Sequence, residues 1–242
     1  MIELSDGAIF IADAHYQVGI REEFYDFLVL VESKKIETKE IVFMGDMFDL
    51  LVGSIEYTMK QNKKVVDLIN SLSKSKKIIY LEGNHDFDLK KVFPTITVVS
   101  LPNQPLVINY HDKHVALSHG DNFGGFGYRL YTTIIRDTFA LKILNFIDKH
   151  NDNFISKKIL KKQKTKQICK KTKEFNKIAK QKLKFYDIAT NRFDLICEGH
   201  YHMDEEFSLD SIRYKFFSSY ACQKTYFQLN FAEKVVFNQL KG

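Results

Sequence analysis

The chain has few cysteines and prolines. Its 242 residues include only 3 Cys and 3 Pro. The cysteines are odd in number, scattered, and without a C-x-x-C pair, which argues against a disulfide framework or a zinc finger and fits a reducing compartment. The scarcity of Pro, together with only 11 Gly, excludes collagen-like and linker-dominated chains.

Long apolar runs are also absent from the sequence. A membrane-spanning helix needs roughly 18–20 apolar residues, whereas the best local runs, at 27–31 and 41–44, last about five residues. The first residues lack the basic region and apolar stretch of a signal peptide. With 45% hydrophobic and 27% charged residues, the composition is that of a globular protein. We therefore expect a cytoplasmic protein.

Positive charge is concentrated in one segment. Residues 157–184 contain 13 Lys and a single acidic residue, Glu174, which gives +12, whereas the rest of the chain carries −6. Such a segment should attract phosphate groups, nucleic acid or an acidic membrane face. A solvated helix face that keeps the protein soluble is the alternative interpretation.

Short apolar runs alternate with helix-period segments in the first part of the chain. Strands are predicted at 8–12, 41–44 and 78–81, with helices at 22–33 and 57–72 between them. Further β-type runs stand at 96–99, 106–109, 115–118, 194–197, 213–217, 226–231 and 234–237. This βαβαβ beginning predicts an α/β fold with a largely parallel, buried sheet.

A long helical block interrupts this pattern. From about 128 to 187 no strand signal and no Pro occur; the block is apolar at 134–147 and later becomes rich in Lys. Because it separates two strands that carry polar motifs, we predict a helical, lysine-rich insertion at 122–192. The core would consist of residues 1–121 and 193–242.

Five short polar clusters follow predicted strands. They are Asp13-x-His15, Gly45-Asp46-x-x-Asp49, Gly83-Asn84-His85-Asp86, His119-Gly120-Asp121 and Gly199-His200-x-His202. The C-terminal ends of parallel strands meet at one edge, where α/β proteins bind ligands. A single cluster would more often be a cap or a satisfied polar group, but all five in this order favour a shared site.

The donor groups at this edge indicate metal ions. The carboxylate, imidazole and amide donors are Asp13, His15, Asp46, Asn84, His119, His200 and His202. Without a thiolate, such a set suits Mn, Fe, Zn or Ni. Seven donors are too many for one ion and enough for two if Asp46 bridges them.

In sequence order, the five motifs resemble those of the calcineurin-like metallophosphoesterase superfamily. The resemblance covers residues 1 to about 121 and 193–242, and it implies a β-sandwich flanked by helices with a dinuclear metal centre. One metal would be held by Asp13, His15, Asp46 and His202, and the other by Asp46, Asn84, His119 and His200. His85 would be the catalytic acid or transition-state stabiliser, oriented by Asp86. Mn²⁺ is the expected metal, with Fe, Zn or Ni as alternatives.

Within that superfamily, the chain resembles the bacterial UDP-2,3-diacylglucosamine pyrophosphatases of lipid A biosynthesis. The length, the helical insertion and the residues Tyr128, Arg129, Tyr131 and Arg136 carry this resemblance. The best-known branch has Gly-Asn-Arg-Asp where this chain has His85, which fits a divergent branch with the same activity as well as generic phosphoesterases. The resemblance implies attack on the α-phosphorus, with release of UMP and 2,3-diacylglucosamine 1-phosphate.

Such a nucleotide-linked glycolipid needs metals for its pyrophosphate, cations for the remaining charge and an apolar groove for its acyl chains. The expected substrate-binding residues are Arg129, Tyr131, Arg136, Lys161 and Lys164. The apolar stretch 134–147 would supply the groove of a lid, although packing of lid helices against each other explains any one of its residues as well. We expect a peripheral protein on the anionic cytoplasmic face of the inner membrane, with no nucleic-acid partner and no obligate protein partner.

Two other functions remain open. A phosphodiesterase or phosphatase acting on nucleotides, nucleic acid or phosphoproteins could use the lysine segment as a nucleic-acid surface. Against it, only Phe175, Phe185 and Tyr186 accompany the lysines, whereas single-strand binders offer several stacking platforms. A metal-free scaffold of the same fold is the more remote alternative, because every predicted ligand position keeps a metal-binding side chain.

Overall fold

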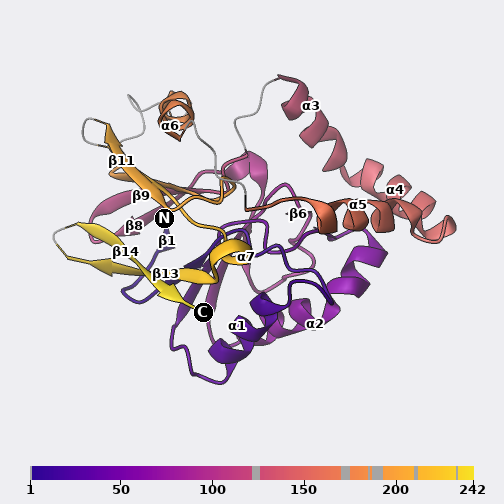
Figure 1. The fold of residues 1–242 in the computed structure, drawn as a ribbon, viewed down its shortest axis with the longest axis horizontal. Coiled ribbons are helices and arrows are strands. Elements are labelled where there is room, and N and C mark those ends of the chain that lie inside the picture. Colours follow the sequence, from indigo (N-terminus) through magenta and orange to yellow (C-terminus); the bar gives the residue numbers. More distant parts are fainter. Residues whose placement is uncertain are drawn as a thin grey trace.

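The computed structural model describes residues 2–121, 126–169, 175–184, 186, 193–209, 212–232 and 234–242. Two six-stranded sheets pack against each other, and helices cover their outer faces (Figure 1). The predicted α/β sandwich flanked by helices is therefore confirmed. Among the described residues, no helix has the length and apolar character needed to cross a membrane.

The first sheet contains the βαβαβ unit. Its strands, in spatial order, are β14 (Val235–Lys241), β13 (Thr225–Phe231), β2 (Ile9–Ile11), β3 (Glu40–Phe43), β5 (Lys77–Leu81) and β7 (Thr97–Val99). The strands β2, β3, β5 and β7 are parallel. The helices α1 (Glu23–Glu32) and α2 (Glu56–Leu72) connect the first three of them and cover one face. Strands buried on both faces explain the continuous apolar runs in the sequence.

The second sheet is built by the later part of the chain. Its order is β1 (Ile2–Glu3), β8 (Leu106–Tyr110), β9 (Lys113–Ser118), β10 (Leu195–Glu198), β12 (Ile212–Phe216) and β11 (Glu205–Leu209). The central strands β9, β10 and β12 are parallel, but β8–β9 and β11–β12 are antiparallel hairpins. The prediction of a largely parallel sheet thus holds for β2, β3, β5 and β7 and for β9, β10 and β12, whereas β13 and β14 of the first sheet and the two hairpins of the second pair in antiparallel fashion. A third, two-stranded sheet pairs β4 (Leu51–Val52) with β6 (Asp86–Phe87).

Apolar side chains from both sheets form the central core. Phe10 and Val42 of the first sheet pack in one cluster with Leu117, Leu195 and Cys197 of the second. Burial of such side chains is the main favourable contribution to folding. Because the two sheets share this core, the C-terminal ends of β2, β3 and β5 are held in a fixed place relative to those of β9 and β10.

In the described part of the segment between β9 and β10 there are four helices, which we call the helical insertion. They are α3 (Phe126–Ile135), α4 (Thr138–His150), α5 (Phe154–Thr165) and α6 (Phe175–Leu183). Figure 1 shows α3, α4 and α5 to one side of the sandwich and α6 over the second sheet. Asp137 begins α4 by accepting hydrogen bonds from the N–H groups of Phe139 and Ala140. Ala179 and Leu183 of α6 pack on the outer face of the second sheet.

Two cysteines are paired, which differs from the expectation that disulfides would be absent. Cys169, after α5, is bonded to Cys222 in the short helix α7 (Tyr220–Gln223). The two residues are separated by 53 positions in sequence, and only the fold brings their Cα atoms to 5.5 Å. Cys197 is a free, buried thiol.

Candidate metal centre

The five polar clusters meet at one end of the sandwich, at the loops that follow β2, β3, β5, β9 and β10. Metal-binding atoms lie within 4.8 Å of one another in three groups: Asp13–His15–His202, His15–Asp46–His85 and Asp46–His119–His200. Asn84 lines a small cavity together with His15, Asp46, His200 and His202. We call Asn84 and the residues of the three groups other than His85 the metal cluster. The structure therefore places all seven sequence-predicted ligands at one site.

Two pairs of imidazole nitrogens face each other at the same distance. Nε2 of His15 lies 3.3 Å from Nε2 of His202, and Nε2 of His119 lies 3.3 Å from Nδ1 of His200. Two ligands bound about 2.1 Å from one ion at tetrahedral angles lie roughly 3.4 Å apart. Each pair therefore has the separation that a shared metal ion requires.

Backbone carbonyls fix the outer nitrogen of two of these rings. Nδ1 of His119 donates to the carbonyl of Met44 at 2.9 Å, and Nδ1 of His202 donates to the carbonyl of Ile168. Because a carbonyl oxygen can only accept, Nδ1 of each ring carries a proton, which leaves Nε2 as the nitrogen that can bind an ion in the metal cluster. Metal-binding histidines are commonly held in this way.

Asp46 is the central carboxylate of the metal cluster. Its Oδ2 lies 3.4 Å from Nε2 of His119, and its Oδ1 accepts the backbone N–H of His85 at 2.8 Å. Burial acts to raise the pKa of Asp46, but the charges of His119 and His85 outweigh burial and hold this pKa well below its usual value. An ionised carboxylate that belongs to two groups of ligands can bridge two ions.

Burial also prepares other members of the cluster for metal binding. It lowers the pKa of His15 and the pKa of His200 to about 3, so both rings are neutral at physiological pH. The Oδ1 atom of Asn84 is buried and has no hydrogen-bond partner among the described residues. A buried unpaired acceptor is costly unless a ligand satisfies it, so Asn84 fits a metal ion here.

Several of the same residues have a left-handed backbone conformation. Five predicted ligands have a φ between 46° and 64°: Asp13, His15, Asp46, His200 and His202. Residues other than glycine rarely adopt this left-handed conformation, which costs about 1–3 kcal/mol. Strain of this kind clusters at functional sites, where the surrounding structure maintains it.

A glycine makes room for the central carboxylate. An added Cβ at Gly83 would lie 2.1 Å from Oδ1 of Asp46 and 2.6 Å from its backbone nitrogen. The glycine of the Gly-Asn-His-Asp motif is therefore required by close packing against Asp46.

His85 lies beside the metal cluster, but it is oriented differently from the prediction. Its Nδ1 donates to the carbonyl of Asp49 at 2.9 Å. The carboxylate of Asp86, expected to orient His85, instead accepts the backbone N–H of Asp46 at 3.0 Å and the hydroxyl of Tyr80 at 2.7 Å. Asp86 is fully buried, and its hydrogen bond to the N–H of Asp46 fixes the loop that carries Asp46.

Asp49 has a role that the sequence analysis did not assign. Its Oδ1 lies 3.3 Å from Nδ1 of His15, and the guanidinium of Arg21 pairs with its Oδ2. Arg21 also donates from Nε to the carbonyl of His15 at 2.9 Å. Neither Nδ1 of His15 nor Oδ1 of Asp49 has a hydrogen-bond partner among the described residues, and a carboxylate in this place behind a metal-binding histidine can fix the ring and its tautomer. In the sequence, the second acidic residue of the Gly-Asp-x-x-Asp motif could have indicated this role.

A buried ion pair fixes the insertion beside His119 and His200 of the metal cluster. Nζ of Lys182, in α6, lies 2.6 Å from Oε2 of Glu198 at the end of β10 and also donates to the carbonyl of Gly120. The hydroxyl of Tyr186 donates to the other oxygen of Glu198. These contacts hold α6 against the loops that carry His119 and His200.

A cavity of about 760 Å³ separates the metal cluster from the insertion. Asn84 and His85 line it on the core side. Apolar side chains line much of the remainder: Leu50, Val52, Phe87, Ile135, Leu141, Leu144, Ile159 and Ile178. Residues of the metal cluster and a set of apolar side chains therefore line the same cavity.

The predicted substrate-binding residues are distributed unevenly around this cavity. Tyr131 and Arg136 line it, whereas Lys161 and Lys164 lie exposed on α5 and are not among its lining residues. The lysines that line the cavity are Lys162, Lys166 and Lys182. The side chain of Arg129 lies outside the described residues.

Arg136 also makes direct contacts with the core. Its guanidinium donates to the carbonyl of Gly83 at 2.7 Å and lies 3.2 Å from Oε2 of Glu82. It also lies 4.7 Å from the ring centre of Phe87. Arg136 therefore ties the insertion to the Gly-Asn-His-Asp loop as well as lining the cavity.

Comparisons with known proteins agree with the family resemblance of the five sequence motifs. A family model for calcineurin-like phosphoesterases matches residues 8–204. UDP-2,3-diacylglucosamine hydrolase of Coxiella burnetii is 30% identical over 114 residues, which are 47% of this chain and 46% of the relative. The hydrolase of the same name from Pseudomonas entomophila is 26% identical over 167 residues, or 68% of this chain and 69% of the relative. The chain spans about half the length of the first curated relatives that it matches.

Solved structures give weaker similarities. A predicted phosphoesterase from Streptococcus pneumoniae aligns with a TM-score of 0.45 at 12% identity, covering 98% of this chain and 89% of that one. Vps29 from Entamoeba histolytica, complexed with zinc, aligns with a TM-score of 0.41 at 12% identity, covering 96% and 97%.

Proposed function

The chain belongs to the calcineurin-like phosphoesterase family, and on that premise we propose that it hydrolyses the pyrophosphate bond of UDP-2,3-diacylglucosamine. The products would be UMP and 2,3-diacylglucosamine 1-phosphate. The chain is a phosphoesterase, a hydrolase that depends on divalent metal ions as its family implies. Relatives named UDP-2,3-diacylglucosamine hydrolase support the choice of substrate.

The residues of the metal cluster fit two ions. Asp13, His15, Asp46 and His202 would hold one, and Asp46, Asn84, His119 and His200 the other. Oxygen and imidazole donors without a thiolate suit Mn²⁺, which we propose as the metal. When bound, such ions lower the pKa of a water molecule and polarise phosphate oxygens.

The chain's own residues would bind and orient the phosphate groups. His85 is fixed by the carbonyl of Asp49 and lines the cavity next to Asn84, so it can contact a phosphate oxygen. Burial lowers the pKa of His85, so its imidazole would take up a proton only beside an anionic phosphate, where it would stabilise negative charge that develops in the transition state. Lys162 and Lys166 line the same cavity and would balance the charge of the second phosphate.

The observation that carries the glycolipid proposal is the cavity between core and insertion. A nucleotide or a phosphopeptide needs no large apolar wall, but two acyl chains do. Ile135, Leu144 and Ile178 of the insertion face this space together with Val52 and Phe87 of the core. Burying apolar acyl carbons gains about 0.8 kcal/mol for each CH₂ group, so this wall would contribute strongly to binding.

Hydrolysis in H₂¹⁸O of UDP-2,3-diacylglucosamine tests the proposal. We expect ¹⁸O in UMP, because attack is proposed at the α-phosphorus, and a lipid monophosphate free of label. UDP-N-acetylglucosamine, which lacks the two acyl chains, should be hydrolysed far more slowly at the same Mn²⁺ concentration. Equal rates on both substrates, or cleavage of RNA or DNA in place of the lipid, would refute the glycolipid proposal.

We further propose that the insertion docks on the anionic cytoplasmic face of the inner membrane. Phe139 and Phe146 of α4 and Phe154 of α5 are 71%, 62% and 61% exposed, which is unusual for aromatic side chains. Lysines accompany them on the same helices, including Lys142, Lys149, Lys157, Lys158, Lys161, Lys162 and Lys164. Exposed apolar residues beside basic ones are typical of helices that lie in a membrane interface.

Vesicle binding tests this docking. Replacing Lys158 and Lys161 with Gln removes two charges worth roughly 1 kcal/mol each near an anionic surface. Partition into phosphatidylglycerol vesicles should fall roughly 30-fold, since 1.4 kcal/mol corresponds to about a factor of ten. Lys34 and Lys35, exposed at the end of α1, give a control pair with the same loss of charge. Equal effects of the two pairs would contradict docking through α5.

A further inference from the structure

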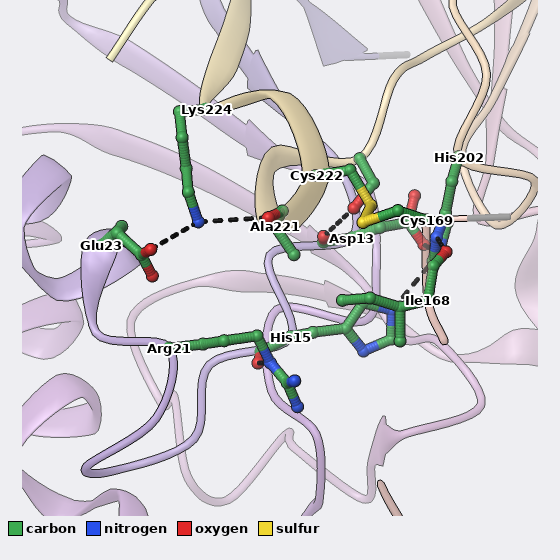
Figure 2. Close-up of a disulfide and its surroundings, with 11 residues drawn as sticks. Asp13, His15, Arg21, Glu23, Ile168, Cys169, His202, Ala221, Cys222 and Lys224 are labelled. Carbon is green, nitrogen blue, oxygen red and sulfur yellow. Dashed lines mark hydrogen bonds and ion pairs between the residues drawn. A yellow bond between two sulfur atoms is a disulfide. The ribbon is translucent and has the colours of Figure 1, made fainter. Parts of the chain in front are cut away.

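A disulfide fastens the insertion to the core beside the metal cluster (Figure 2). It joins Cys169, which follows α5, to Cys222 in α7. Cys169 is exposed and Cys222 is half-buried, so a soluble thiol can reach the bond. The hydrolysis proposed above uses neither cysteine.

Residues 166–169, which we call the strap, lie against the metal cluster. The strap lines a second cavity of about 230 Å³ together with His15, Asp46 and His202. The carbonyl of Ile168 accepts the hydrogen bond from Nδ1 of His202 (Figure 2). Among the described residues, the strap is connected to the core by this hydrogen bond and by the disulfide.

The other end of the disulfide is fixed at the same cluster. The N–H of Ala221 and the hydroxyl of Ser219 donate to the carbonyl of Asp13 at 3.2 and 2.7 Å. Lys224 pairs with Glu23 of α1 at 2.7 Å, which anchors the end of α7 (Figure 2). The disulfide therefore joins the strap, whose Ile168 carbonyl is bonded to His202, to an element that is itself bonded to Asp13.

We propose that the Cys169–Cys222 disulfide is a redox-sensitive fastening that positions the carbonyl of Ile168 on His202, so that its reduction weakens metal binding. The inference rests on the proposed function only in taking His202 as a metal ligand. Partners that orient a metal-binding histidine contribute 10–100-fold to metal affinity. Where a compartment is reducing, disulfides are usually transient and often redox-sensing.

The redox step balances with a dithiol reductant. The Sγ–Sγ bond of Cys169 and Cys222 breaks, each sulfur takes a proton, and the reductant supplies two electrons as it closes its own disulfide. The strap then keeps one hydrogen bond to the core. A single hydrogen bond contributes less free energy than ordering four residues costs, so His202 loses its partner for much of the time.

Mn²⁺ titration by calorimetry tests this inference on the full chain. The oxidised protein is compared with protein reduced by dithiothreitol and then desalted under argon. We expect one Mn²⁺ site to weaken by at least tenfold on reduction and to recover after treatment with oxidised glutathione. Cys169→Ser should show the weaker site under both conditions. Cys197→Ala, which removes the free thiol in β10, should behave as the wild type.

Equal Mn²⁺ affinities in the oxidised and reduced wild-type protein would overturn the inference. So would a peptide mass map in which Cys169 and Cys222 remain thiols after oxidised glutathione. Neither measurement uses the glycolipid. Redox-dependent Mn²⁺ binding by a protein that leaves UDP-2,3-diacylglucosamine intact would therefore refute the proposed substrate and not the fastening.

Discussion

Replacing Gly83 with Ala should disable the metal cluster by moving one carboxylate. The new Cβ would lie 2.1 Å from Oδ1 of Asp46, whereas real Cβ contacts are essentially never shorter than 3.0 Å. Asp46 must then move by roughly 1 Å, and its backbone nitrogen, 2.6 Å from the same Cβ, prevents the side chain from adjusting alone. A misplacement of roughly 1 Å can cost about 10²-fold in rate, and overpacking of a tight site costs about 1–3 kcal/mol.

Turnover of a small chromogenic phosphodiester, Mn²⁺ affinity and thermal unfolding together measure the effect of Gly83→Ala. For a chain of this size we expect Tm to fall by roughly 2–12 °C, at about 2–4 °C per kcal/mol. Gly127→Ala is the matched control, because nothing lies within 4 Å of a Cβ there and the residue is helical. That control should keep activity and gain up to about 1 kcal/mol. Wild-type rate and Mn²⁺ affinity in Gly83→Ala would show that the close approach to Asp46 is dispensable.

Three further substitutions test other parts of the site. Asp46→Ala should abolish both turnover and binding of two Mn²⁺ ions, since its carboxylate belongs to two ligand groups; normal rate with both ions bound would refute the assigned site. His85→Ala should keep both ions but lower kcat by roughly 10²–10⁴, and an unchanged kcat would make His85 structural. Asp49→Asn should weaken Mn²⁺ binding by roughly 10–100-fold, because the carboxylate of Asp49 faces Nδ1 of His15 and pairs with Arg21; equal affinity would assign Asp49 to folding alone.

Features set by local patterns were predictable from the sequence. The apolar runs at 41–44 and 78–81 become β3 and β5 because both strands are buried on both faces. The periodic segment at 57–72 is α2, with its ends displaced by one residue at most. The family and its metal-binding motifs could also be recognised, because each motif immediately follows a strand and keeps its spacing.

Features that depend on distant parts of the chain were not predictable. The antiparallel pairing of β13 with β2 joins residues more than 200 positions apart, and no local pattern encodes it. β11 was missed because its sequence, Glu-Glu-Phe-Ser-Leu, is polar at its start and lies at a sheet edge. The Cys169–Cys222 pair depends equally on the completed fold.

The role of Asp86 was predicted wrongly for a different reason. Its place beside His85 in the motif suggested that it orients that ring, yet adjacent residues in an extended segment point to opposite sides. The structure places the carboxylate of Asp86 under the loop of Asp46, and a carbonyl 36 residues away holds His85. Sequence adjacency identified the right residues here but not their partners.

The order of the predicted ligands along the chain has a consequence for how this protein would acquire metal ions during synthesis. Each half of the site receives its last imidazole from the loop after β10: His202 joins Asp13 and His15, and His200 joins Asp46 and His119. Neither half is complete until the ribosome has made the whole insertion and β10. Because an incomplete set of ligands binds a divalent ion weakly, metal capture would be a late event that follows the addition of β10 to the second sheet. A nascent chain interrupted within the insertion would therefore be left without its ions and without an active phosphoesterase site.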